Sequence, residues 1–121
     1  MDRSFQRLLL ESNRLHDLGD PQGARALEEE ALASGSEQVV NTLGYCYLFQ
    51  HKDVERAVTL FQKNVEDYPA SWNAHDSLGE ALALQGKLEE AVAAFSIARE
   101  MAPEAHARRI LRTMDQLASL N

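Results

Sequence analysis

The feature that most constrains the fold of this 121-residue chain is a spacing of 34 residues. Three residue types recur at this interval, by subtraction of their residue numbers: Ala57 and Ala91, Phe61 and Phe95, and Pro69 and Pro103. A period of this length is the size of one helical hairpin, which leaves an apolar face open and must stack on a neighbour to bury it. The spacing therefore predicts a stack of helical hairpins.

A Leu-Gly pair also recurs, at a slightly longer spacing than the other three residue types. Leu43-Gly44 and Leu78-Gly79 are 35 positions apart, which predicts one inserted residue in the turn at residues 50–53. Glycine has no Cβ, so the two helices of a hairpin can approach each other closely at these positions. The repeated alanines do the same from the second helix, and the repeated phenylalanines fill the space that remains.

The rest of the pattern is helical throughout. Apolar residues at helical spacing predict seven helices and no strand, over residues 3–18, 21–34, 37–50, 54–67, 72–85, 88–101 and 104–119. Polar residues that favour N-caps stand before four of these helices: Asp20, Ser36, Asp53 and Ser71. Gly35 is suited to the left-handed conformation that ends a helix.

Composition excludes several classes of protein. The formal net charge is -7 and the pI is near 5.0, so phosphate backbones would be repelled and nucleic acid is not expected as a partner. The single cysteine, Cys46, lies in an apolar run and is expected to be a buried small hydrophobe. No apolar run reaches the ~20 residues that span a bilayer. We expect a cytoplasmic protein without a membrane partner, or a domain excised from a longer chain.

The order Leu-Gly, Ala-x-x-x-Phe and Pro at this period resembles the tetratricopeptide repeat family. The resemblance implies an all-α solenoid, a right-handed superhelix of helical hairpins, as a single domain over residues 1–121. Two repeats are expected at residues 37–70 and 71–104, and a C-terminal capping helix at 104–119. Residues 3–36 resemble a degenerate repeat, because Ser12 replaces the glycine and Glu28 replaces the aromatic residue.

The resemblance also implies a binding surface. In this family the first helix of each repeat lines a concave groove that binds an extended peptide or a helix of a partner protein. The corresponding residues here are Gln38, Asn41, Tyr45, Leu48, Asn73, Asp76 and Glu80, with Phe49 beside them. We predict a protein–protein interaction or scaffold module that uses them.

The chemistry of these side chains bears on the partner. Family members that bind chaperones hold a C-terminal carboxylate with Lys, Arg and Asn, and only Asn41 matches that set. Asp76 and Glu80 would repel a carboxylate, so a basic or apolar partner is expected. The arginines on the last helix, Arg108, Arg109 and Arg112, are expected to be its solvated face, or otherwise a docking patch.

The sequence offers no motif for catalysis or for a cofactor. No His pair stands three or four residues apart, and no nucleophile elbow, phosphate loop or Cys-x-x-Cys is present. His75, Asp76 and Glu80 share a helix and could touch one ion, but solvated or partner-facing side chains explain them better. We therefore expect neither an enzyme nor a metal or cofactor site.

Two alternative functions remain open. The segments at 41–45 and 69–81 are similar to repeats that follow some bacterial serine hydrolases and esterases, where they form a C-terminal accessory domain. The apolar residues of the seventh predicted helix suggest instead self-association through an end of the solenoid.

Overall fold

The computed structural model describes residues 3–120, so residues 1, 2 and 121 of the predicted domain lie outside it. The described part is all-α, as predicted. Its α-helices are α1 (Arg3–Asp17), α2 (Pro21–Leu32), α3 (Glu37–Tyr45), α4 (Val54–Asp67), α5 (Trp72–Leu84), α6 (Leu88–Met101) and α7 (Glu104–Ala118). A π-helical turn, η1 (Cys46–Gln50), continues α3.

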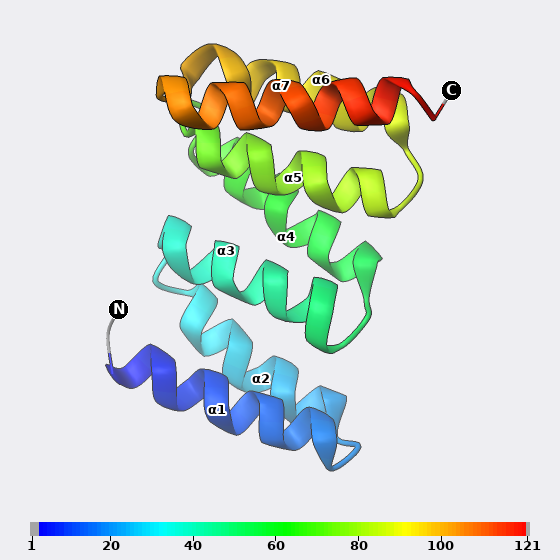
Figure 1. Cartoon of the computed structure of the whole chain (residues 1–121). Coiled ribbons are helices and arrows are strands. Elements are labelled where there is room, and N and C mark those ends of the chain that lie inside the picture. Colours follow the sequence, from blue (N-terminus) through cyan, green and yellow to red (C-terminus); the bar gives the residue numbers. More distant parts are fainter. Residues whose placement is uncertain (1–2, 121) are drawn as a thin grey trace.

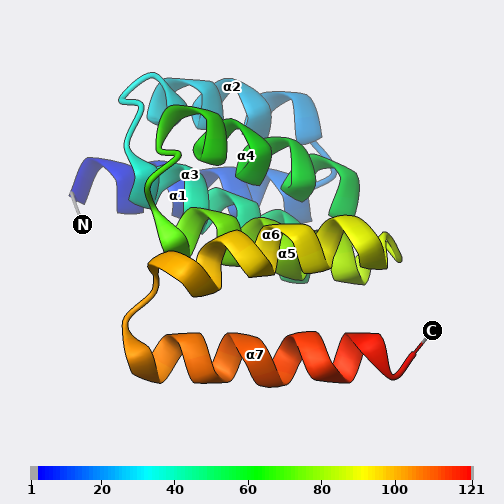
Figure 2. The same ribbon diagram turned by 90° about the horizontal axis from the view of Figure 1, so that it is seen from above.

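The helices form a stack of antiparallel hairpins (Figure 1). Figure 1 looks onto α1, α3 and α5, which run in the same direction, with α2 and α4 behind them. Seen from above, α2 and α4 lie on one side of the stack and α7 lies on the other (Figure 2). Because successive hairpins cover one another, each can bury the apolar face that it could not bury alone.

The predicted helix starts are confirmed. Asp20, Ser36, Asp53 and Ser71 each accept a hydrogen bond from the backbone N–H three residues later, which satisfies a donor that the first helical turn leaves free. Gly35 has a φ of 67°, which is the left-handed conformation expected after α2. The first turn of each of these helices is therefore specified by its own sequence.

The predicted close approach at the glycines is also confirmed. A Cβ added to Gly79 would lie 2.8 Å from the Phe95 ring, and one added to Gly44 would overlap the Phe61 ring. Phe61 and Phe95 are almost completely buried, and they belong to the two hydrophobic clusters of the core. Each aromatic ring thus fills the space that a missing side chain opens on the facing helix.

The inserted residue lies in a different place from the one predicted. Lys52 and Gly86 are 34 positions apart and both have positive φ, at 56° and 86°, so the two turns are in register. The extra residue is accommodated earlier, in η1, where the His51 N–H donates to the Cys46 carbonyl at 3.0 Å. A wider helical turn absorbs one residue without breaking the backbone hydrogen bonds, which explains why the turn itself is unchanged.

Polar contacts fix the start of α3. Within the second hairpin, the Asn64 side chain of α4 donates to the Glu37 carbonyl at 3.1 Å, and the Tyr68 hydroxyl donates to the Gly35 carbonyl. The Ser71 hydroxyl, at the N-cap of α5, donates to the Glu37 carboxylate. This last contact joins the starts of α3 and α5, and those starts form one end of the surface described next.

Candidate functional site

The candidate site is the surface made by the facing sides of α3, η1 and α5, which we call the α3–α5 groove. Six of the seven predicted residues meet there with side chains at least partly accessible on α3 and α5: Gln38, Asn41, Tyr45, Asn73, Asp76 and Glu80. An open pocket of about 460 Å³ marks its N-terminal end and is lined by Glu37, Gln38, Asn41, Thr42 and Asn73. This end of the groove is rich in carboxamide side chains, which offer both donors and acceptors.

A hydrogen-bonded chain joins the two helices beneath the groove. The Tyr45 hydroxyl donates to Ser77 Oγ at 3.2 Å, and Ser77 Oγ donates to Asn41 Oδ1 at 2.7 Å. Ser77 is buried, so this small side chain acts from below the surface. Oδ1 of Asn41 accepts from Ser77, so the remaining hydrogen-bonding capacity of this pocket-lining side chain includes its amide N–H₂ donor.

Two aromatic side chains, Tyr45 and Phe49, form the other end of the groove. The rings of Tyr45 and Phe49 stack with centroids 5.9 Å apart, and Tyr45 meets the buried Phe61 ring edge-on at 5.0 Å. Burial raises the pKa of the Tyr45 hydroxyl to about 12, so it stays a hydrogen-bond donor at neutral pH. Phe49 is 54% exposed, which makes it an apolar side chain that solvent or a partner must cover.

On the acidic side of the groove, an arginine of the same chain neutralises one of the two carboxylates. Arg109 of α7 donates to Asp76 Oδ2 at 2.7 Å, while Asp76 Oδ1 is buried and has no hydrogen-bond partner among the described residues. Burial raises the pKa of the nearby Glu80 carboxyl, and the Asp76 carboxylate raises it further, against the opposing influence of the Tyr45 hydroxyl and Arg109. A cationic partner beside Glu80 would stabilise its ionised form against this burial.

One predicted residue is placed differently from the rest. Leu48 is only 6% exposed and packs in the core, so its assignment to the groove is wrong. The π-helical turn is the reason, since the extra residue rotates the side chains of η1 relative to an α-helix. Gln38 is exposed at the rim of the pocket.

Sequence reasoning missed two residues that shape the groove. Ser77 carries no spacing signal, because it is a serine in the middle of a helix, and the sequence predicts Arg109 as a solvated or partner-docking residue. The 34-residue period could have indicated Arg109, because it lies 33 positions after Asp76 and therefore near the equivalent place on α7. The rings of Trp72 and His106 lie in tilted contact, with centroids 4.5 Å apart, and join α5 to α7.

A second polar cluster lies between the first and second hairpins, away from the groove. Nε2 of His16 is 3.1 Å from a Glu28 carboxylate oxygen, and the Tyr47 hydroxyl donates to the other oxygen. The rings of His16 and His51 stack at 3.8 Å, and His51 also reaches Asn13 at 3.2 Å. No sequence motif marks this cluster, because its members come from α1, α2 and the segment formed by η1 and His51.

Neither a metal site nor a membrane-crossing helix is found in the described part of the chain. Over residues 3–120, no three His, Cys, Asp or Glu side chains are grouped so that they could hold a metal ion. Within the same range, no helix has the length and apolar character needed to cross a bilayer. His75 is buried and bonds the Pro69 carbonyl at 2.9 Å, so the ring serves the turn before α5.

Comparison with known sequences decides the family. The family model described as "Tetratricopeptide repeat" matches residues 46–106, which is half of the chain. The chain belongs to the tetratricopeptide repeat family. The match covers η1 and the whole of α4, α5 and α6, and therefore includes Phe61, Gly79 and Phe95. The comparison with curated proteins finds no significant match.

Solved structures with the same fold include three proteins of different origin. SycD, a type III secretion translocator chaperone of Yersinia enterocolitica, has a TM-score of 0.69 and 14% identity, covering 93% of this chain and 82% of SycD. The N-terminal domain of C. elegans stress-induced protein-1 has a TM-score of 0.64 and 18% identity, covering 98% and 99%. MamA of AMB-1 has a TM-score of 0.62 and 27% identity, covering 93% and 68%. The tetratricopeptide-type solenoid predicted from the period is thus confirmed.

Proposed function

We propose that the protein is a protein–protein interaction module whose α3–α5 groove binds a segment of a partner protein. The bound segment carries an apolar side chain next to a Lys or Arg. The observation that carries the proposal is the meeting, on one surface, of a carboxamide-lined pocket, an exposed Phe49 and a half-buried Glu80. Residues 3–36 and 104–119 act as the degenerate repeat and the cap that flank it.

Each part of the groove suits one part of such a segment. Asn41 and Asn73 can donate to and accept from the main chain of an extended peptide, which is a sequence-independent contact. Phe49 offers an apolar surface beside Tyr45 for the anchor side chain. Glu80 can pair with a cation, and such a pair would lower the raised pKa of its carboxyl.

A carboxylate-bearing partner tail suits this surface poorly. The cation nearest to the acidic pair is Arg109, which is already paired with Asp76. A carboxylate placed there would have to compete with Asp76 for the guanidinium and would stand near Glu80. The description of SycD as a translocator chaperone supports a protein partner in general terms. An accessory role beside a hydrolase and self-association remain predictions.

A peptide-display selection on the immobilised wild-type protein tests the proposal. We expect enriched peptides with a Lys or Arg close to an apolar residue. The best of them, labelled with fluorescein, should lose about tenfold in affinity on Glu80→Gln and on Phe49→Ser, because each change removes one contact of roughly 1.4 kcal/mol. Asp76 is left intact, since its replacement would also free Arg109 and disturb α7.

Matched controls separate the groove from nonspecific effects. Glu100→Gln makes the same change as Glu80→Gln, and Ile97→Ser replaces an apolar side chain by serine as Phe49→Ser does. Both control positions are exposed on α6, and both variants should leave the affinity within about twofold. Equal affinity for the two groove variants and the wild type would remove the groove assignment. Enrichment of acidic peptides that depend on Glu80 would contradict the partner chemistry.

A further inference from the structure

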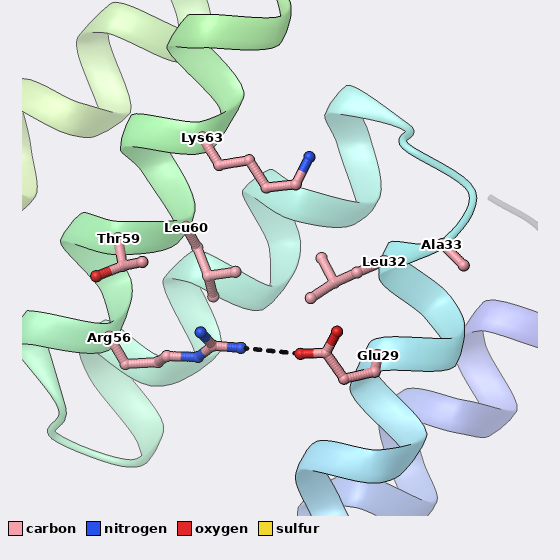
Figure 3. Close-up of a pocket in the computed structure, with 7 residues that line it drawn as sticks. All are labelled: Glu29, Leu32, Ala33, Arg56, Thr59, Leu60 and Lys63. Carbon is pink, nitrogen blue, oxygen red and sulfur yellow. Dashed lines mark ion pairs between the residues drawn. The ribbon is translucent and has the colours of Figure 1, made fainter.

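A second pocket lies on the opposite side of the stack, between α2 and α4 (Figure 3). Its volume is about 310 Å³, and we call it the α2–α4 pocket. Its lining consists of Glu29, Leu32, Ala33, Arg56, Thr59, Leu60 and Lys63. No residue of the α3–α5 groove contributes to it, so the two surfaces are separate.

The lining has a regular order along α4. Arg56, Leu60 and Lys63 are four and three residues apart, which places them on one face of the helix. Figure 3 shows these side chains extending from α4 toward α2, with Leu60 and Leu32 pointing toward one another between the two cations. Seven residues of helix rise about 10 Å, so an apolar floor about that long has a cation at each end.

The cations are available to a ligand to different degrees. Arg56 has its guanidinium 5.7 Å from the centre of the Tyr47 ring, and its buried Nε has no hydrogen-bond partner in the described part of the chain. Its contact with Glu29 is loose, at 3.7 Å, and Glu29 is exposed. Lys63 pairs with Asp67 one turn along the same helix, and both are well exposed, so water competes for that pair.

The charge of the pocket contrasts with the rest of the protein. Two cations and one carboxylate line it, in a chain whose formal net charge is -7. An acidic ligand would therefore be attracted to this place and repelled from most of the remaining surface. A basic ligand would find two positive charges here and better sites elsewhere.

We propose that the α2–α4 pocket is a second docking site, for an acidic extended segment of a partner protein. The segment places one apolar side chain between two carboxylates, with the apolar group on Leu32 and Leu60 and the carboxylates at Arg56 and Lys63. Successive side chains of an extended chain point to opposite faces, and the chain advances about 3.3 Å per residue, so side chains two and four positions apart face the pocket together and the outer pair spans ~13 Å. The long side chains of Arg56 and Lys63 cover the difference from the ~10 Å between their positions on the helix. The expected pattern is Asp or Glu, any residue, an apolar residue, any residue, and Asp or Glu.

This site would make the protein a connector with two chemically opposite faces. The groove would take a segment with a cation, and the pocket would take a segment with carboxylates. Because the two surfaces lie on different sides of the stack, both segments could be bound at once. The proposal does not depend on the groove, since it uses none of the same residues.

The test uses the same peptide-display selection on the wild-type protein, analysed for a second class of sequences. We expect an acidic class with the pattern above. Its tightest member, labelled with fluorescein, should bind the Thr59→Glu, Lys63→Glu double variant about tenfold more weakly, because charge reversal turns one attraction into a repulsion. Ala33→Phe, which fills the pocket without changing its charge, should weaken binding to a similar extent.

The control makes the same change in charge elsewhere. Lys87→Glu with Ser96→Glu, both at exposed positions outside the pocket, should keep the affinity within about twofold. Glu80→Gln should also leave it unchanged, which separates this site from the groove. Absence of an acidic class, equal loss in the control, or competition with the groove peptide would each overturn the proposal.

Discussion

The first and second hairpins fill equivalent positions between their two helices with side chains of different chemistry, polar in the first and apolar in the second. In the second hairpin the buried ring of Phe61 packs against Gly44, where a Cβ would overlap it. In the first hairpin the corresponding positions hold Ser12 and Glu28, and both are buried. The Glu28 carboxylate accepts from the Tyr47 hydroxyl of the next hairpin, a contact that a phenylalanine could not make.

The difference shows that glycine is needed on the first helix of a hairpin only where an aromatic ring packs against it from the second helix. Where the ring is present, the facing residue must lack a Cβ. Where a carboxylate replaces the ring, a serine fits, and its hydroxyl donates to the Leu9 carbonyl at 3.0 Å. Burying the Glu28 carboxylate is unfavourable unless it has polar partners, and His16 and Tyr47 supply them.

The largest expected effect comes from removing the ring. Phe61→Ala should lower the free energy of unfolding by about 3–5 kcal/mol, because it leaves a cavity against Gly44. Glu28→Ala should cost less, about 1–3 kcal/mol, by leaving the Tyr47 hydroxyl without its acceptor. Urea denaturation followed by circular dichroism measures both. If Phe61→Ala does not fold, Phe61→Leu should still lose about 1–2 kcal/mol. A larger loss in Glu28→Ala than in Phe61→Ala would reverse the comparison.

The next effect tests whether glycine is needed only opposite the ring. Gly44→Ala should cost about 1–3 kcal/mol, since its methyl group overlaps the Phe61 ring. Ser12→Ala, its counterpart, should cost no more than about 1 kcal/mol, because only one hydroxyl contact is lost. Thermal unfolding of both variants gives the comparison. Equal losses would show that the two positions have the same packing.

A smaller effect is expected at the turns. Lys52 has a φ of 56°, in the left-handed region that favours glycine, where its counterpart Gly86 has 86°. Lys52→Gly should therefore stabilise the protein by up to about 1 kcal/mol, and Gly86→Ala should destabilise it by about 1 kcal/mol. Both are read from urea denaturation. A loss of stability in Lys52→Gly would mean that the lysine side chain contributes more than its strained backbone costs.

The smallest effect concerns how stability depends on pH at the contact between the first and second hairpins. Burial lowers the pKa of His51 below its ordinary value of 6.5, and the stacked His16 lowers it further, against the opposing influence of Glu28, Asp17 and Asp53. The unfolded chain thus binds this proton more readily, so the contribution of His51 is present above pH 6.5 and is lost as the pH falls.

The matched variant for this test is His51→Gln, which can keep the contact with Asn13. Between about pH 7.5 and about pH 5.5, where histidine titrates, the wild type should lose stability more steeply than this variant. Hydrogen exchange should show the loss first in α1 and α2. Parallel pH profiles for the two proteins would show that His51 does not titrate differently on folding.

Much of the fold could be predicted from the sequence. The 34-residue period of Ala, Phe and Pro predicts the repeated hairpin, because each repeat must pack in the same way on its neighbour. The four capping residues and the left-handed Gly35 act within a few residues, so they place the helix ends almost to the residue. The π-helical turn could not be predicted, because a one-residue insertion can lie anywhere between Gly44 and Lys52. That single uncertainty put Leu48 on the wrong side of its helix.

The candidate site was less predictable, because its geometry depends on contacts between distant helices. Arg109 and Asp76 are 33 residues apart, and Ser77 reaches Asn41 over 36. Neither pair has a sequence motif, and both follow from how the hairpins stack. The stack also creates the α2–α4 pocket, whose two cations on α4 carry no sequence motif.

The central claim is that a partner segment binds along α3 and α5, and amide chemical-shift mapping tests it most directly. The ¹⁵N-labelled protein is titrated with the basic-apolar peptide from the selection. We predict the largest shifts at Asn41, Tyr45, Phe49, Asn73 and Glu80, with the residues of the α2–α4 pocket unchanged. Shifts concentrated on α2, α4 and α6, with the groove unaffected, would contradict the account.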